Sequence, residues 1–196
     1  MEPIILASGS LRRQEYFRLM GLPFNIIPAQ IDETYSPEMS PREVTAELAA
    51  RKVSRIIEML QGRTAPWICG ADTVISLEGA IFGKPQDREH ARAMLSQLKG
   101  RTHQVITSIA LFNGGTRVLD CRSGESAVTF APLTEREIEW YLNTGEWQGV
   151  AGAYRIQGLG SCLIANIAGS YSGIVGLPIR EFYVMLLENG YPYGAA

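Results

Sequence analysis

Residues 7–13, ASGSLRR, carry the residue types of an anion-binding turn. Two hydroxyl and two guanidinium groups follow one another here, those of Ser8, Ser10, Arg12 and Arg13. A helix that begins here would add the partial positive charge of its N-terminus, and arginine binds phosphate through paired hydrogen bonds. The alternative is an ordinary capped helix with two solvated arginines. The spacing is not that of a Walker A loop.

Lys52 lies on the apolar stripe of a predicted helix, four residues from Leu48 and four from Ile56. A lysine at such a position costs free energy unless its ammonium reaches solvent along the surface or meets an anion. The pattern alone leaves both interpretations open. The second makes Lys52 an ammonium that the helix delivers inward.

Carboxylates occur at two places where they could bind a metal. Asp72 ends an apolar run, so we expect it at the end of a buried strand, pointing into a crevice at the edge of the sheet. Helix capping or a turn is an equally common role for such a residue. Asp32 and Glu33 open a long loop, and if they face Asp72 they complete an oxygen-rich site suited to Mg²⁺ or Mn²⁺. Otherwise they are two solvated acids.

Two further candidates lie later in the chain. Lys84 precedes a proline, which predicts an extended segment, and on its own it is a surface lysine. Residues 152–158, GAYRIQG, contain glycines that permit close backbone approach, and Gln157 has donor and acceptor atoms for the edge of a nucleobase. The alternative is a glycine-rich loop that closes onto the sheet.

The elements that must position these residues alternate between strands and helices, which is typical of an α/β fold. We predict strands at residues 3–7, 24–28, 67–72, 104–112, 118–130 and 161–167. We predict helices that begin after Ser10, Ser40, residue 87, Thr134 and Pro178. Ser40 with Glu43, and Thr134 with Glu137, have the spacing of capping boxes.

Composition narrows the class of protein. A chain of 196 residues with 46% hydrophobic content and no internal repeat predicts one domain, 1–196. A net charge of −2 argues against stable binding to nucleic acid. The three cysteines form no C-x-x-C pair, which favours a reducing compartment. Without a signal-like start or a long apolar stretch, we expect a cytoplasmic protein that does not bind a membrane. Only two histidines and no G-x-S-x-G motif argue against a Ser–His hydrolase or a zinc enzyme.

Taken together and in order, these blocks resemble the Maf family, known as septum-formation inhibitors. The match runs nearly end to end, through LASGSLRR, IDE, AARK, GADTV, GKP, LKGRTH, GE, AGAYRIQG, GSY and VGLP. Members of the family are nucleoside triphosphate pyrophosphatases. The resemblance implies an α/β fold similar to that of the inosine-triphosphate pyrophosphatases, with a mixed central sheet flanked by helices and two lobes separated by an active-site cleft.

The resemblance also implies roles for the residues above. The residues implied to bind the triphosphate are Ser8, Arg12, Arg13, Lys52 and Lys84. Asp72 is implied to accept the proton of the water that attacks the α-phosphorus, releasing pyrophosphate. Glu33 and Asp72 are implied to position Mg²⁺ or Mn²⁺. A homodimer and a role in cell-division arrest are implied as well.

Substrate choice is implied by three positions. Arg12, Thr73 and Gln157 together resemble the branch that acts on dTTP and UTP. The branch that acts on 7-methyl-GTP tends to carry glutamate in place of Gln157, and a carboxylate prefers a donor-rich, cationic purine. Leu11 stands where the family usually has proline, which we expect to affect affinity more than activity. The alternatives are a 7-methyl-GTP-type enzyme, or a regulator that binds nucleotide or a division partner without turnover.

Overall fold

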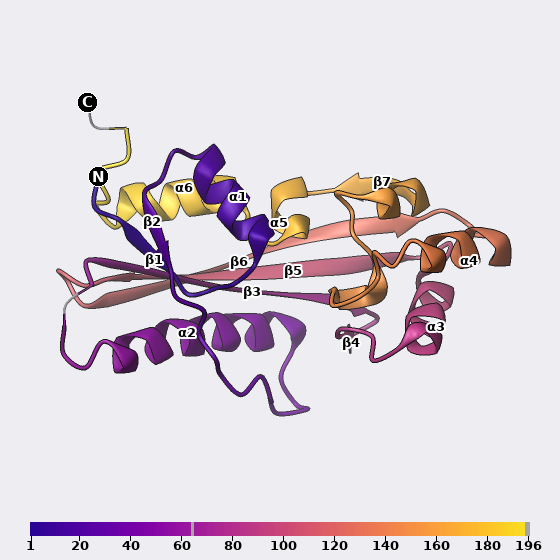
Figure 1. Cartoon of the computed structure of the whole chain (residues 1–196), viewed down its shortest axis with the longest axis horizontal. Coiled ribbons are helices and arrows are strands. Elements are labelled where there is room, and N and C mark those ends of the chain that lie inside the picture. Colours follow the sequence, from indigo (N-terminus) through magenta and orange to yellow (C-terminus); the bar gives the residue numbers. More distant parts are fainter. Residues whose placement is uncertain (64, 195–196) are drawn as a thin grey trace. The chain divides into compact units, whose positions relative to one another are not determined.

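The computed structural model, which describes residues 1–63 and 65–194, is a mixed sheet with helices packed against it (Figure 1). The strands are β1 (Ile4–Leu6), β2 (Phe24–Ile26), β3 (Trp67–Leu77), β4 (Ala80–Phe82), β5 (Thr102–Asn113), β6 (Val118–Phe130) and β7 (Ile164–Ala168). The α-helices are α1 (Leu11–Leu19), α2 (Pro41–Met59), α3 (Arg88–Leu98), α4 (Glu135–Asn143), α5 (Tyr171–Val175) and α6 (Ile179–Glu188). The 3₁₀ helices are η1 (Ala151–Ala153) and η2 (Leu159–Leu163). The predicted α/β class, with a mixed sheet flanked by helices, is confirmed.

The sheet contains parallel and antiparallel pairs in the order β2-β1-β3-β5-β6-β7, with β4 paired to β3. Strand β1 runs parallel to both β2 and β3, whereas β4 is antiparallel to β3 and β7 is antiparallel to β6. Strands β5 and β6 are neighbours joined by residues 114–117, a connection that is long enough only for an antiparallel hairpin.

The chain divides into two compact units. The first unit comprises Met1–Asp72, Thr107–Gly124 and Gly176–Ala196, and the second comprises Thr73–Ile106 and Glu125–Val175. The boundaries fall inside β3, β5 and β6, so each of these strands contributes residues to both units. The cleft that the sequence implies between two lobes stays a prediction.

In the first unit, helices cover both faces of the sheet. Alternate residues of β1 point to opposite faces, because side chains along a strand alternate. Ile4 and Leu6 pack in one hydrophobic cluster with Phe17 of α1 and Phe182 of α6. Ile5 packs in a second cluster with residues of α2. Figure 1 shows α1 and α6 together on one side of the strands and α2 on the other.

Helix α2 begins with the predicted capping box. The Ser40 hydroxyl accepts a hydrogen bond from the Glu43 amide, and the Glu43 carboxylate accepts one from the Ser40 amide. One turn later, buried Thr45 contacts the Ser108 hydroxyl at 2.6 Å, and Ser108 contacts the Ser123 hydroxyl at 2.7 Å. This chain of hydroxyl groups fixes the start of α2 on β5 and β6.

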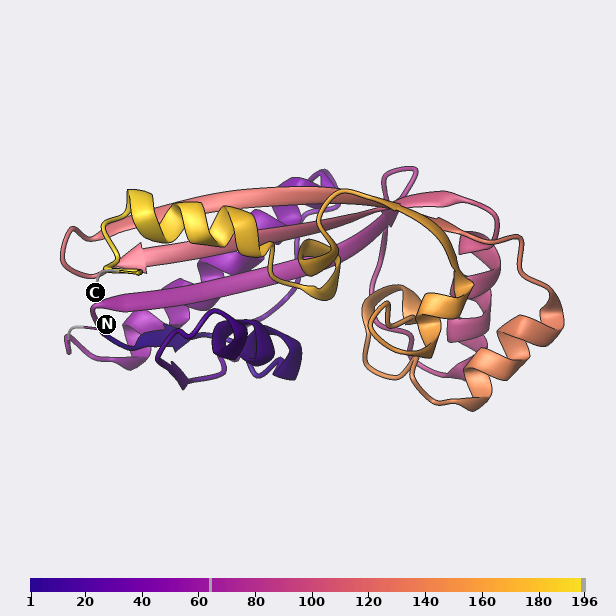
Figure 2. The ribbon, with the colours of Figure 1, turned by 90° about the horizontal axis from the view of Figure 1, so that it is seen from above.

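The end of the described chain returns to its beginning. The Tyr191 hydroxyl donates a hydrogen bond to the Glu2 carbonyl oxygen at 2.8 Å, and the Tyr193 hydroxyl donates one to the Met20 carbonyl oxygen at 2.7 Å. Figure 2 shows the last described residues on the same side of the first unit as the N-terminus. These bonds fasten the segment after α6 to β1 and α1.

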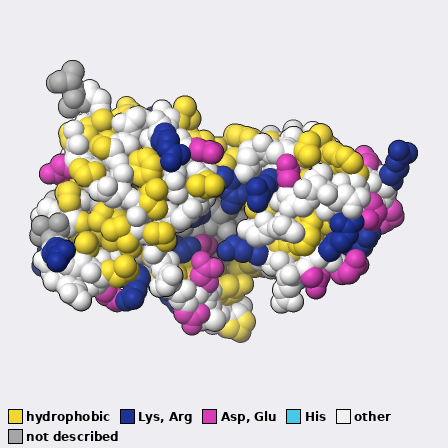
Figure 3. Space-filling view, in the orientation of Figure 1, with side chains coloured by type: hydrophobic (Ala, Val, Ile, Leu, Met, Phe, Trp, Pro, Cys, Tyr) yellow, Lys and Arg dark blue, Asp and Glu magenta, His cyan; other side chains and the backbone are white. Residues whose placement is uncertain are grey.

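The second unit carries its charged groups on the outside of its helices. Thr134 and Glu137 form the second predicted capping box at the start of α4. Ion pairs join α3 to α4, among them Arg88 with Glu139 at 2.9 Å. Lys99, directly after α3, also pairs with Glu135 at the start of α4, at 2.9 Å. Figure 3 shows basic and acidic side chains interspersed over these two helices.

Three sequence predictions need correction. Strand β3 does not end at Asp72 but continues to Leu77, because Val74 and Ile75 extend a strand that is buried on both faces. The strand predicted at residues 161–167 begins only at Ile164, after the 3₁₀ helix η2. Helix α1 does follow Ser10, but within the described chain the Ser10 side chain accepts no capping hydrogen bond.

Two further findings concern sequence features. No helix within residues 1–63 and 65–194 is both long and apolar enough to cross a membrane. All three cysteines are free: Cys121 and Cys162 are exposed, whereas Cys69 is buried in β3, where burial raises the pKa of its thiol to about 12. Cys121 belongs to the first unit and Cys162 to the second.

Candidate functional site

The predicted anion-binding turn connects β1 to α1, and it brings Arg13 onto Ser8. The Ser8 side chain is buried, and its hydroxyl accepts a hydrogen bond from Arg13 Nη1 at 3.1 Å and one from the Ser10 amide at 3.3 Å. Arg13 Nε also donates to the carbonyl oxygen of Gly176, at 2.9 Å. Gly176 precedes α6 and was not among the predicted site residues, since a backbone carbonyl leaves no mark in the sequence. The turn therefore holds a guanidinium in a fixed orientation, while Arg12 lies half-buried beside it.

The environment of Arg13 is electrostatically unusual. Burial lowers the pKa of its guanidinium, and the negative charges of Asp72 and Glu33 oppose that shift. An arginine keeps its proton in proteins despite such a shift. Arg13 is thus a desolvated cation near two carboxylates, and desolvation strengthens its attraction for an anionic ligand.

Lys52 points inward from α2, as one of the two interpretations of its position predicts. Its side chain is only 10% exposed, and its Nζ lies 2.6 Å from Asp72 Oδ1 and 3.2 Å from Glu33 Oε1. The anion that this lysine meets is therefore supplied by the protein itself. Local sequence patterns could not have identified these partners, because Glu33 lies in the loop before α2 and Asp72 in strand β3 after it, and no local spacing pairs either of them with Lys52.

Gly70 allows α2 to lie this close to β3. A Cβ atom at Gly70 would be 2.5 Å from the Ala49 carbonyl oxygen, which is closer than real Cβ contacts occur, and 3.0 Å from Val53 Cγ2, which is tighter than most. The same Cβ would be 3.4 Å from Lys52 Cβ. Because the glycine lets the helix backbone approach the strand, the Lys52 ammonium reaches a carboxylate two residues farther along β3.

The two adjacent acids at the start of the loop have different partners. The Asp32 carboxylate accepts a hydrogen bond from the Thr34 amide at 2.9 Å, which lowers the pKa of Asp32. Glu33 instead reaches Lys52. Arg51 of α2 holds the loop by donating to the carbonyl oxygens of Asp32, at 3.3 Å, and Thr34, at 2.7 Å. Glu33 is thus the acid of this pair that belongs to the site.

Glu33 and Asp72 together fit a hard divalent cation. Across the described residues, no group of three or more His, Cys, Asp or Glu side chains is placed to hold a metal ion. Mg²⁺ in nucleotide-binding proteins nevertheless commonly uses one or two carboxylates, the remaining positions being filled by water and by phosphate oxygens of the substrate. The donor set therefore fits a metal that is shared with a nucleotide better than a metal held by protein alone.

The other predicted residues belong to the second unit. Thr73 directly follows Asp72 in β3 and is half-buried, whereas Lys84 and Gln157 are exposed. The segments that carry Lys84 and Gln157 are tied together, because the Gly152 amide donates to the Gly83 carbonyl oxygen at 3.0 Å. Contact of these three side chains with a substrate stays a prediction.

A buried cluster of three rings supports the segment that carries Gln157. His103 Nε2 lies 2.8 Å from the Tyr154 hydroxyl, and both rings pack edge-on against Phe130. Burial lowers the pKa of His103 to about 4, so the ring is neutral at pH 7. Sequence reasoning missed this contact. The sequence did contain one signal that Tyr154 is buried. Apolar and polar residues alternate after Ala153, and in the structure Tyr154 and Ile156 are buried while the residue that follows each of them is exposed.

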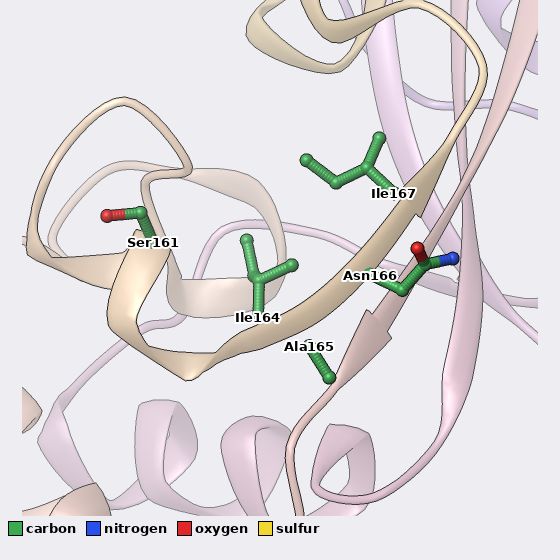
Figure 4. A pocket seen from close by; sticks show the side chains of 5 residues that line it. All are labelled: Ser161, Ile164, Ala165, Asn166 and Ile167. Atoms are coloured by element: carbon green, nitrogen blue, oxygen red, sulfur yellow. The ribbon is translucent and has the colours of Figure 1, made fainter.

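An open pocket of about 330 Å³ lies elsewhere in the second unit, along β7 (Figure 4). Among the described residues it is lined by Ser161, Ile164, Ala165, Asn166 and Ile167. These are not the residues predicted to bind a nucleotide.

Known proteins resemble this chain over nearly its whole length. Residues 3–189 match the family described as Maf-like protein. A dTTP/UTP pyrophosphatase of Symbiobacterium thermophilum is 42% identical over 98% of this chain and 96% of its own length. A dTTP/UTP pyrophosphatase of Escherichia coli O157:H7 is 41% identical, over 95% and 92%. A protein of Xylella fastidiosa named nucleoside triphosphate pyrophosphatase is 39% identical, over 91% and 94%.

A solved structure also matches, that of the Ham1 protein of Staphylococcus aureus, with a TM-score of 0.48 and 16% identity over 67% of this chain and 73% of that chain. We build no argument on so distant a likeness. The family match and the relatives at about 40% identity both cover nearly the whole chain. The chain belongs to the Maf family.

Proposed function

We propose that this protein is a nucleoside triphosphate pyrophosphatase that hydrolyses dTTP and UTP to the monophosphate and pyrophosphate. The observation that carries the proposal is the buried pair of Lys52 and Asp72, with Glu33 and Arg13 beside it. The names of the relatives supply the substrate class, since those from Symbiobacterium and Escherichia are dTTP/UTP pyrophosphatases.

The cationic side chains are assigned to the triphosphate. Arg13 is oriented by Ser8 and by the Gly176 carbonyl oxygen, so its remaining N–H donors have a defined direction. A planar guanidinium held in this way binds a phosphate more selectively than a mobile ammonium does. Arg12 and Lys84 are assigned the same kind of contact from the family resemblance.

Asp72 is assigned as the proton acceptor. The water that it deprotonates attacks the α-phosphorus, the bond between that phosphorus and the bridging oxygen breaks, and pyrophosphate leaves. A carboxylate can act in this way when its position is right, and the place of Asp72 in the middle of a buried strand keeps that position fixed. Mg²⁺ or Mn²⁺, held by Glu33 and Asp72, would neutralise negative charge on the phosphate oxygens.

The experiment that tests this function is a panel of nucleoside triphosphates with Mg²⁺, followed by detection of pyrophosphate. The panel contains dTTP, UTP, 7-methyl-GTP and inosine triphosphate. We expect release from dTTP and UTP, no release after chelation of the metal, and none from an Asp72→Asn protein purified in the same way. If folded protein releases no pyrophosphate from any member of the panel, with Mg²⁺ or with Mn²⁺, the proposed activity is wrong. The alternative is then a regulator that binds nucleotide without turnover.

The preference for pyrimidines is assigned to Gln157, with Thr73 and Arg12. Gln157 is exposed, next to a segment anchored by Tyr154, so the amide is available to a ligand. We expect Gln157→Glu to lower kcat/KM for UTP and to raise it for 7-methyl-GTP, because a carboxylate offers only acceptors. Gln148→Glu, in the same glycine-rich region, serves as the control and should leave the ratio of the two substrates unchanged. An unchanged ratio in Gln157→Glu would remove the residue from base selection.

Three expectations concern the context of this activity: the family resemblance implies a homodimer, the composition favours a cytoplasmic location, and the family resemblance implies a role in cell-division arrest. Sedimentation of the purified protein at several concentrations tests the first, and overexpression of active and Asp72→Asn protein, with cell length as the readout, tests the last. If cells that overexpress either protein become equally elongated, division arrest does not depend on hydrolysis.

A further inference from the structure

The Lys52 ammonium lies between the two carboxylates that are assigned to the metal. Its Nζ is 2.6 Å from Asp72 Oδ1 and 3.2 Å from Glu33 Oε1. A divalent cation that binds both carboxylates needs the same space, and two cations that close together repel each other strongly in a desolvated site. Lys52 and the metal therefore compete for Glu33 and Asp72.

The charges of the site are already balanced without a metal. Glu33 and Asp72 contribute two negative charges, and Lys52 and Arg13 contribute two positive charges. A divalent cation added alone would leave an excess of two positive charges in a partly buried cluster. A triphosphate removes this excess, because it brings several negative charges of its own and gives the displaced ammonium a new partner.

The two carboxylates that Lys52 contacts differ in exposure, which makes the exchange feasible. Asp72 is 12% exposed and lies within a strand, whereas the Glu33 side chain is 54% exposed and belongs to the loop before α2. Lys52 itself is a flexible side chain on a long helix, so its ammonium can move while the helix backbone stays in place.

We propose that Lys52 is the counter-cation of Glu33 and Asp72 in the metal-free protein, and that a divalent cation binds these carboxylates only when a triphosphate draws Lys52 away. This inference rests on the proposed function for the identity of the ligands. It goes beyond that function because it makes binding of metal and binding of nucleotide mutually dependent. The dependence is reciprocal, so each ligand raises the affinity for the other by the same factor.

The test measures Mn²⁺ binding by electron paramagnetic resonance, without nucleotide and without turnover. We expect weak binding to the wild type and binding at least about tenfold tighter to Lys52→Met, within the range usual for coupled sites. Lys52→Arg keeps the positive charge and should bind as weakly as the wild type. Lys99→Met removes an exposed lysine that pairs with Glu135, and as the matched control it should change nothing.

A second arm uses the wild type alone, so the test does not depend on the folding of one variant. An α,β-imido analogue of UTP is not cleaved, and water proton relaxation distinguishes slowly tumbling protein-bound Mn²⁺ from the Mn²⁺–nucleotide complex. We expect the analogue to raise the affinity of the wild type for Mn²⁺ to that of Lys52→Met.

Three outcomes would overturn the counter-cation role: equal affinity of Lys52→Met and wild type for Mn²⁺, weaker binding by Lys52→Met, or no effect of the analogue on a wild type that binds it. Failure of the proposed function would look different. In that case pyrophosphate release would be absent while Lys52→Met still bound Mn²⁺ more tightly than the wild type.

Discussion

The two units of this chain differ in the polar side chains that they bury: those of the first unit include charged groups, whereas those of the second are neutral. Among the described residues, the buried side chains that carry a formal charge are Lys52 and Asp72, and both belong to the first unit. The buried polar residues of the second unit are Ser76, His103 and Ser126, and burial keeps the histidine neutral at pH 7.

This difference separates a binding role from a positioning role. Buried charges are expensive and are tolerated when they compensate one another, so a charged ligand can take the place of one partner. A buried neutral pair such as His103 and Tyr154 contains no charged partner that a ligand could replace. Its contact instead holds the two segments that carry these residues in place. We therefore expect changes at the buried charges of the first unit to affect catalysis most, and changes at the buried neutral pair of the second unit to affect stability.

We expect the largest loss of activity from Asp72→Asn, which keeps the shape of the side chain but removes its charge. Loss of a general base lowers kcat by about 10²- to 10⁴-fold, measured as pyrophosphate released from UTP. Asp120→Asn is the control, because Asp120 also lies on a strand of the first unit and pairs with Arg122 at 2.7 Å. Equal losses in the two variants would mean that Asp72 acts on the fold and not on the reaction.

Gly70→Ala should have the next largest effect, because the new Cβ would collide with the backbone of α2. We expect a loss of about 1–3 kcal/mol in the free energy of unfolding, measured in urea, together with reduced activity as Lys52 moves away from Asp72. Gly124→Ala is the matched control, since a Cβ there would meet Pro178 Cβ at an ordinary 3.5 Å. If both alanine variants behave alike, the close approach of helix and strand at Gly70 is not required.

His103 should make stability depend on pH. Its pKa is about 4 in the folded protein, below the ordinary value of 6.5 that applies to the unfolded chain, so protonation favours unfolding. The neutral ring of His103 makes its full contribution to the free energy of unfolding above pH 6.5. This contribution is lost as the pH falls toward 4, which lowers the free energy of unfolding by roughly 3 kcal/mol. Urea unfolding between pH 7.5 and 4.5 should therefore show a flatter profile for His103→Gln than for the wild type. Parallel profiles would contradict a buried neutral histidine.

The smallest effect should come from Lys99→Met. Its ion pair with Glu135 is exposed, and exposed pairs contribute little to stability because water and salt screen them. We expect an unchanged urea midpoint and unchanged activity. A clear drop in the midpoint would weaken the contrast between the units, because it would show that surface charge stabilises the second one.

Local sequence patterns predicted much of the fold. The capping boxes at Ser40 and Thr134 marked the starts of α2 and α4 correctly, because the bonds that form them lie within four residues. The end of β3 was predicted wrongly at Asp72. A polar residue usually marks the edge of a buried strand, but here it is retained inside one because Lys52 of α2 neutralises it.

The sequence indicated which types of residue belong to the site, but not which of these side chains contact one another. The apolar stripe offered an inward direction for Lys52 as one of two interpretations, and its bonds to Glu33 and Asp72 depend on contacts between different segments of the chain. His103 was counted only as one of two histidines, since nothing near it in the sequence indicates Tyr154 as its partner. Patterns of adjacent residues report the shape of helices and strands, and they carry no record of which distant side chains meet.

The cysteines have a practical consequence for following motion in solution. The exposed thiols of Cys121 and Cys162 belong to different units, while the third thiol, Cys69, is buried with a pKa raised to about 12. A thiol that stays protonated reacts slowly with maleimide dyes. The natural sequence therefore provides one labelling position on each unit. Fluorescence energy transfer between two such dyes can report whether nucleotide binding changes the distance between the units, with no engineered residue.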